Sequence, residues 1–67
     1  MIKIGDCVTI HHNATNYNGG AIPPHAYNMT WVVRSIADTR CVLGQSRDNP
    51  NISLNLPIDV KYLDLTM

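Results

Sequence analysis

The segment from His11 to Met29 shows neither of the two periods that mark regular secondary structure. Asn, Gly and Pro dominate it, and its apolar residues follow neither strand nor helix spacing. We therefore predict one long loop near the start of the chain. A loop longer than about 15 residues in a compact domain usually carries function, unless its assignment is wrong.

Strands are expected on both sides of this loop. Before it, Asp6 to Ile10 alternates with period two and predicts a first strand with Val8 and Ile10 facing the core. After it, Thr30 to Ile36 is rich in β-branched and aromatic residues, which favour strands. This segment is the predicted second strand.

A hairpin and a fourth strand follow. The short turn Ala37-Asp38 is expected to join the second strand to a third, Arg40 to Leu43. Gln45 to Asn51 is polar with a central proline and predicts an exposed loop, and Ile52 to Leu56 then alternates as the fourth strand. The apolar residues expected on one side of that strand are Ile52, Leu54 and Leu56.

The end of the chain completes an all-β domain. Pro57 is expected to end the fourth strand because proline has no amide hydrogen for the ladder. Asp59 to Leu63 is too short for an ordinary helix and predicts a 3₁₀ turn, and Leu63 to Leu65 predicts a brief fifth strand. These elements predict a small five-stranded SH3-like barrel, with a long first loop and a 3₁₀ turn before the last strand.

The charged residues are few and balanced. Five Lys and Arg stand against five Asp, there is no Glu, and the basic residues are spread singly along the chain. A surface that binds phosphates needs clustered cations, so we expect no nucleic-acid partner. Neutral or zwitterionic ligands fit this composition better.

The chain is short for a stable domain. Its 67 residues make a single domain, residues 1–67, whose core should contribute about 3 to 5 kcal/mol unless a disulfide, a metal or a partner subunit adds to it. Cys7 and Cys41 lie in separate alternating segments without zinc-site spacing. We expect free thiols, and a disulfide is the alternative if their strands pair.

No segment has the length and apolarity of a membrane span. The first residues also lack the apolar block of a signal peptide. We expect a protein made in the cytosol without a membrane span; if it acts outside the cell, another route must deliver it.

Short motifs follow one another in an order and spacing that are typical of one family. They are Gly5-Asp6, Ala14, Tyr17, Gly19-Gly20, Ile22-Pro23, Trp31 with Val33, Arg40 to Leu43, Ile58 and Tyr62-Leu63. Together they resemble the bacterial SH3-like (SH3b) cell-wall-binding domains of phage endolysins and other peptidoglycan hydrolases. The resemblance covers nearly the whole chain, and only Gln45 to Asn51 is unmatched.

Two positions depart from the family pattern. Where the family often has Trp two residues after Ile-Pro, this chain has Pro24 and then His25, which removes a large stacking surface. Where the family has Gly near the end of the loop, this chain has Asn28, which tolerates left-handed backbone. The first departure bears on the ligand, and the second is compatible with the fold.

The resemblance implies a ligand groove between the long loop and the 3₁₀ turn. Aromatic faces there would suit sugar rings and the peptide stem of peptidoglycan. Trp31 and Tyr62 have burial in the core as an alternative, and Gly19-Gly20 has a tight turn with positive φ as its alternative. The ligand-binding residues expected are Tyr17, Asn18, Gly19, His25, Tyr27, Trp31 and Tyr62.

No catalytic or metal-binding set is expected. His11, His12 and His25 lack a third ligand at metal spacing, and the five Asp each fall at a turn or a strand end. No nucleophile and base can be paired by spacing, and two carboxylates for glycoside chemistry would need to face each other across a cleft. We therefore expect a binding domain without a cofactor rather than an enzyme.

The resemblance implies a module that targets an endolysin to the wall of a Gram-positive host. Its partners would be peptidoglycan or a wall-linked polymer, and the catalytic domain or full-length endolysin. Some endolysins produce this domain separately from an internal start, so a homo-oligomer or an assembly with the full-length enzyme is a further expectation. The alternative is an intracellular SH3-like adaptor or subunit that binds a protein partner.

Overall fold

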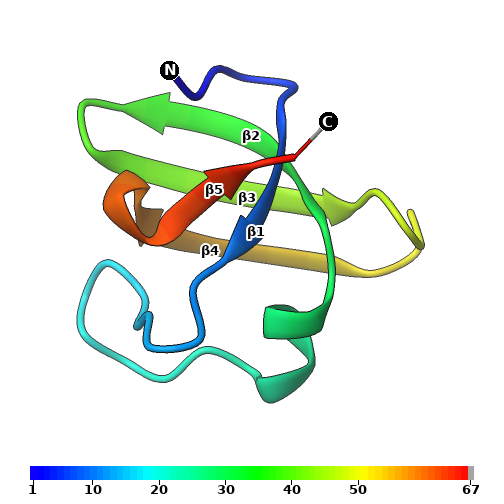
Figure 1. Cartoon of the computed structure of the whole chain (residues 1–67), viewed down its shortest axis with the longest axis horizontal. Coiled ribbons are helices and arrows are strands. Elements are labelled where there is room, and N and C mark those ends of the chain that lie inside the picture. Colours follow the sequence, from blue (N-terminus) through cyan, green and yellow to red (C-terminus); the bar gives the residue numbers. More distant parts are fainter. Residues whose placement is uncertain (67) are drawn as a thin grey trace.

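A computed structural model describes residues 1 to 66 and shows one antiparallel sheet of five strands (Figure 1). The strands are β1 (Cys7–Ile10), β2 (Trp31–Ala37), β3 (Arg40–Ser46), β4 (Ser53–Asp59) and β5 (Leu63–Leu65). Their order across the sheet is β4-β3-β2-β1-β5. The predicted all-β, SH3-like barrel is confirmed.

A single 3₁₀ turn carries the chain from one edge of the sheet to the other. This turn, η2 (Val60–Tyr62), joins β4 to β5. The Asp59 carboxylate accepts a hydrogen bond of 3.0 Å from the backbone N–H of Lys61, which satisfies a donor that the short turn leaves free. The 3₁₀ turn expected within Asp59 to Leu63 is therefore confirmed.

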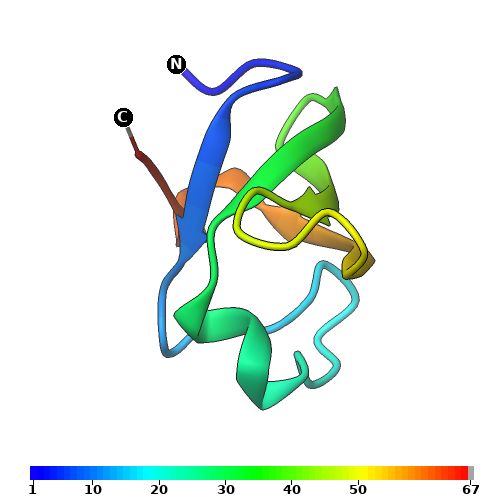
Figure 2. The ribbon, with the colours of Figure 1, turned by 90° about the vertical axis from the view of Figure 1, so that its right-hand side faces the viewer.

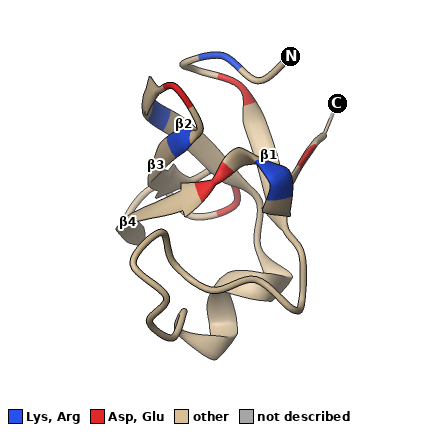
Figure 3. Ribbon diagram, turned by 90° about the vertical axis from the view of Figure 1, so that its left-hand side faces the viewer, with Lys and Arg blue, Asp and Glu red and all other residues tan. Residues whose placement is uncertain are grey.

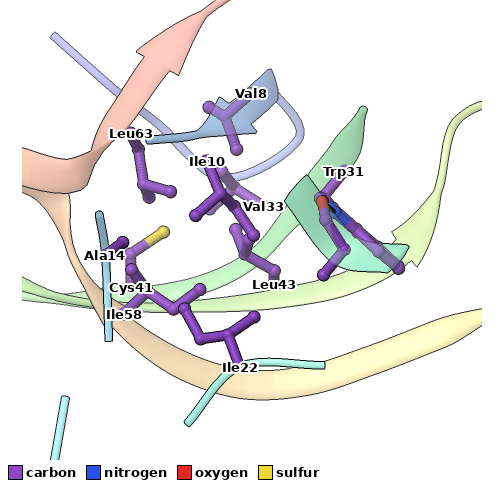
Figure 4. Packing of buried hydrophobic residues seen from close by; sticks show 11 residues of the cluster. Val8, Ile10, Ala14, Ile22, Trp31, Val33, Cys41, Leu43, Ile58 and Leu63 are labelled. Atoms are coloured by element: carbon purple, nitrogen blue, oxygen red, sulfur yellow. Dashed lines mark hydrogen bonds between the residues drawn. The ribbon is translucent and has the colours of Figure 1, made fainter. Parts of the chain in front are cut away.

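The core lies between β1 and β5 on one side and β2, β3 and β4 on the other (Figures 1 and 4). β1 supplies Val8 and Ile10, whose side chains are 0% and 3% exposed, as their alternation predicts. The remaining core residues come from the other strands and from the long loop. They are Ala14, Ile22, Ala26, Trp31, Val33, Cys41, Leu43, Ile58 and Leu63.

The β2–β3 hairpin turns one residue later than expected. Ala37 and Arg40 are still paired, so the turn consists of Asp38 and Thr39. Asp38 has φ of 58°, in the left-handed region that Asp tolerates better than most residues because its short polar side chain can bond locally. The hairpin itself is confirmed.

The prediction that Pro57 ends the fourth strand is wrong. β4 continues through Pro57, which is paired with Val42, to Asp59. β4 lies at an edge of the sheet, where only one of its sides needs hydrogen-bond donors. Edge position depends on the sheet order, which the local sequence does not reveal.

Asn55 lies at an irregularity in the backbone and pairing of β4. Its φ is 54°, and the pairing of β3 with β4 shifts register between Leu43 and Gln45. The strand starts at Ser53 rather than Ile52, and its fully buried residue is Ile58. Ile52, Leu54 and Leu56 are only half-buried.

The long loop is packed rather than open. It contains a second 3₁₀ segment, η1 (Pro24–Asn28), which begins at a proline and was not predicted. Ala14, Ile22 and Ala26 of the loop are all buried. Figure 2 shows η1 and the rest of the loop at the end of the barrel opposite the N-terminus and the end of β5.

Both cysteines are free, as expected. Cys7 is half-buried on β1 and Cys41 is buried on β3, with β2 between these strands. Cys7 alternates with the core residues Val8 and Ile10, so its side chain leaves the face that buries Cys41.

No helix in the described part of the chain is long and apolar enough to cross a membrane.

The first prediction concerns core packing. Leu43 is fully buried, so Leu43→Ala should lower the free energy of unfolding by about 2 to 5 kcal/mol. That loss is comparable with the whole stability expected of a domain this small, so much of the variant should be unfolded at 25 °C. Urea unfolding followed by the fluorescence of Trp31, the single tryptophan and a buried one, measures this loss.

The control is Leu65→Ala, at a residue that is 49% exposed. It should change stability by about 0.5 kcal/mol or less, and equal losses in the two variants would contradict the core assignment.

The second prediction concerns pH. Burial raises the pKa of the Cys41 thiol above its ordinary value of 9.0. Above that pH the unfolded thiol loses its proton while the folded one keeps it, so stability falls as pH rises toward the raised pKa. Cys41→Val keeps an apolar side chain of similar size without the titration. Between pH 7 and pH 10 the wild type should lose more urea stability than Cys41→Val, and identical pH profiles would contradict the argument.

Candidate functional site

The tip of the long loop, residues 16 to 20, closes on itself through Asn16. The side-chain oxygen of Asn16 accepts hydrogen bonds from the backbone N–H of Asn18 at 2.9 Å and of Gly20 at 3.0 Å. The backbone of Asn16 also bonds to Gly19 and Gly20. Asn favours such turns because its side chain can replace a backbone acceptor. The tip is therefore fixed by internal bonds.

The two glycines serve this turn in different ways. Gly19 has φ of 86°, which other residues rarely adopt, so the tight-turn alternative applies to it. At Gly20, an added Cβ would lie 2.8 Å from Nδ2 of Asn16. Gly20 therefore leaves room for the Asn16 side chain.

Tyr17 attaches the tip to the barrel and still presents its ring. Its backbone N–H donates to the carbonyl of Pro57 at 2.7 Å, and its hydroxyl shares a hydrogen bond of 3.0 Å with Oγ1 of Thr39. The loop thus contacts both β4 and the β2–β3 turn. Tyr17 is 43% exposed, whereas Tyr27 and Tyr62 are half-buried and Trp31 is buried.

Tyr27 lies in η1 and is half-buried. Its hydroxyl donates to the carbonyl of Ala14 at 2.7 Å. The ring of His12 stacks on it at 5.8 Å between centroids and 15° between planes. Because these contacts occupy the hydroxyl and part of the ring, Tyr27 mainly holds the two arms of the loop together.

The structure places Trp31 in the core. Its exposure is 0%, and its indole N–H donates to the carbonyl of Ala26 at 2.9 Å. The core alternative therefore applies, and in this conformation the ring offers no face to a ligand. His25, exposed on η1, lies against it with 6.5 Å between ring centroids.

Tyr62 lies on η2, half-buried against the core. The ammonium of Lys61 lies 5.1 Å from the centre of its ring. The carbonyl of Tyr62 accepts from the N–H of His11 at 2.8 Å, and Nε2 of His11 lies 2.8 Å from a carboxylate oxygen of Asp64. Tyr62 therefore borders the start of the loop.

The expected residues thus fall into three groups rather than one continuous aromatic groove. Tyr17, Asn18 and Gly19 form the exposed tip. His25 and Tyr27 lie on η1 over the buried Trp31, and Tyr62 lies on η2. No group of three or more His, Cys, Asp or Glu that could hold a metal occurs within residues 1 to 66.

The loop carries no acidic side chain and no lysine or arginine. None of the residues from Cys7 to Val33 is Asp, Glu, Lys or Arg. Figure 3 shows the coloured segments toward the other end of the barrel, so η1 and the part of the long loop beyond His11 form an uncharged end. We call residues 12 to 29 the neutral pole. This feature, and the bonding role of Asn16, were missed by the sequence reasoning, although the uninterrupted run without charge was visible in the sequence.

An apolar hollow of about 870 Å³ lies elsewhere, next to the N-terminal segment. Met1 to Ile4, Ile36, Asp38 and Val60 line it. It includes none of the expected ligand-binding residues. Sequence reasoning did not identify it because it combines residues from distant parts of the chain.

No protein-family model, curated protein or solved structure matches this chain.

The third prediction concerns the tip. Asn16→Ala removes the acceptor for two backbone N–H groups, each worth about 0.5 to 1.5 kcal/mol. The NMR order parameters of Asn18 and Gly20 should then fall from about 0.85 to below about 0.6. Asn16→Asp keeps an acceptor oxygen and should leave them high. If Asn16→Ala left the tip as rigid as before, the turn would not depend on this side chain.

Proposed function

We propose that this protein is a non-catalytic cell-wall-binding module that brings a peptidoglycan hydrolase, such as a phage endolysin, to the wall of a Gram-positive bacterium. The ligand would be peptidoglycan or a wall-linked polymer. The catalytic activity would belong to another domain or chain. The SH3-like fold and the resemblance of the sequence to SH3b domains support this proposal.

The observation that carries the proposal is the neutral pole with the exposed ring of Tyr17. Sugar rings and peptide stems present C–H surface and neutral hydrogen-bonding groups, and an exposed tyrosine can cover the first while adjacent amides bind the second. Tyr17 and Asn18 are exposed on the same fixed tip. A charged polymer such as nucleic acid would find no cation on this surface.

The fixed tip also lowers the cost of binding. A loop that is ordered before it meets its ligand loses less conformational entropy on binding. The bonds of Asn16 inside the tip, and of Tyr17 to Thr39 and Pro57, supply that order. His25 is exposed on η1 and supplies a further hydrogen-bonding group at the same pole.

The fourth prediction tests wall binding directly. The fluorescently labelled protein should co-sediment with purified sacculi from at least one Gram-positive species in a broad panel. Tyr17→Ala should weaken this binding about tenfold, or about 1.4 kcal/mol, because a central aromatic contact is lost. Binding should change less than about threefold between about 0.05 and 0.5 M NaCl, because no cation lies at the neutral pole.

Two variants control for folding and position. Tyr17→Phe keeps the ring and loses only the bond to Thr39, so it should retain most of the binding. Ile4→Ala changes a residue 64% exposed outside the loop and should retain all of it. Trp31 fluorescence checks that each variant is folded. No enrichment on any sacculus would overturn the proposal and favour an adaptor that binds a protein partner.

A further inference from the structure

A second hollow, of about 400 Å³, lies on the sheet and has a mixed polar and apolar lining. β2, β3 and β4 each contribute two residues to it, and none belongs to the loop. The lining residues are Val32, Arg34, Gly44, Gln45, Ser53 and Asn55.

Gly44 leaves room for the Arg34 side chain on this face of the sheet. It is buried within β3, and a Cβ added there would lie 3.2 Å from Cβ of Arg34. Contacts this short require the neighbour to move. The absence of a side chain at Gly44 therefore lets the stem of Arg34 lie close over β3.

Asn55 adopts a backbone conformation that a strand residue rarely has. Its φ of 54° lies in the left-handed region, inside β4 and opposite the register shift near Gly44. Its side-chain oxygen accepts a hydrogen bond of 3.1 Å from Nη1 of Arg34. The strained residue thus aims the guanidinium, and strain of this kind concentrates at functional sites.

Arg34 has no acidic partner. The only ion pair within residues 1 to 66 joins His11 and Asp64, and none of the residues that line the hollow is Asp or Glu. Asn55 uses one of the five guanidinium donors, and the others remain available to a ligand. Exposed Gln45 and Ser53 add neutral hydrogen-bonding groups, and half-buried Val32 adds apolar surface.

From this arrangement we infer that the hollow is a binding site for a small carboxylate, namely the C-terminal carboxylate of a short peptide. A guanidinium presents parallel donors at the spacing of two carboxylate oxygens, which a point charge does not. Val32 would contact the adjacent side chain of the peptide, and Ser53 and Gln45 its amide groups. This inference does not rest on wall binding, because it uses a different surface.

The fifth prediction is an NMR titration of the ¹⁵N-labelled full chain with three probes: N-acetyl-alanyl-alanine, the same peptide as its C-terminal amide, and inorganic phosphate. The free acid should shift the amide resonances of Gly44, Gln45, Ser53 and Asn55 along saturable curves. The amide form should bind at least tenfold more weakly, and so should phosphate, which lacks the peptide part. Equal binding of phosphate, equal binding of the amide form, or no saturable shift would overturn the inference.

Variants separate the site from the fold. Arg34→Met should abolish the saturable shifts, and Arg34→Lys should weaken them severalfold because it loses the planar pair of donors. Arg47→Met is the matched control, because Arg47 is exposed and lies outside the hollow, and this variant should bind like the wild type.

Asn55→Gly tests the role of Asn55. This variant should fold with an equal or higher melting temperature, since glycine accepts φ of 54°, yet it should bind the peptide severalfold more weakly. If Asn55→Gly bound as tightly as the wild type, Asn55 would not orient the arginine.

Discussion

The buried hydrogen bond between Trp31 and Ala26 is the interaction on which the rest of the structure depends. It joins the largest side chain of the core to η1 of the long loop. A loop of this length is costly to order, and in a small domain little apolar surface is available to offset that cost. The loop offsets part of this cost because three of its side chains are buried in the core. They are Ala14, Ile22 and Ala26. The loop is therefore part of the barrel, and its buried residues hold its exposed residues in place.

This dependence explains what could be predicted from the sequence. Period two located the strands, because alternate residues such as Val8 and Ile10 face one side whatever their partners are. Pro57 was misjudged because the rule against proline applies to central strands, and only the sheet order puts β4 at an edge. η1 was not predicted because a 3₁₀ segment this short shows no repeating pattern of apolar residues in the sequence. Its conformation is fixed by the packing of Ala26.

The candidate site was less predictable than the fold for the same reason. An aromatic residue in a loop or at the start of a strand can face either the core or the solvent, and the local sequence does not determine which. Trp31 can lie in the core because its N–H finds an acceptor there, whereas the hydroxyl of Tyr17 finds its partner, Thr39, at the surface. Both hydrogen-bond partners come from distant or irregular parts of the chain. The choice between core and surface was therefore made by tertiary contacts.

Charge divides the surface into regions with different binding chemistry. The neutral pole can attract a ligand only through contact and hydrogen bonds, which act at short range and depend little on salt. Arg34 on β2 instead offers a full charge, held by a strained Asn55 and without an acid to neutralise it. An exposed arginine can satisfy its donors with water in many orientations. A fixed orientation of the Arg34 guanidinium therefore needs a contact within the protein. The contact that the structure provides is with the acceptor oxygen of Asn55 on β4, which lies across β3 from Arg34, and the planar pair of guanidinium donors then matches the two oxygens of a carboxylate as a point charge cannot.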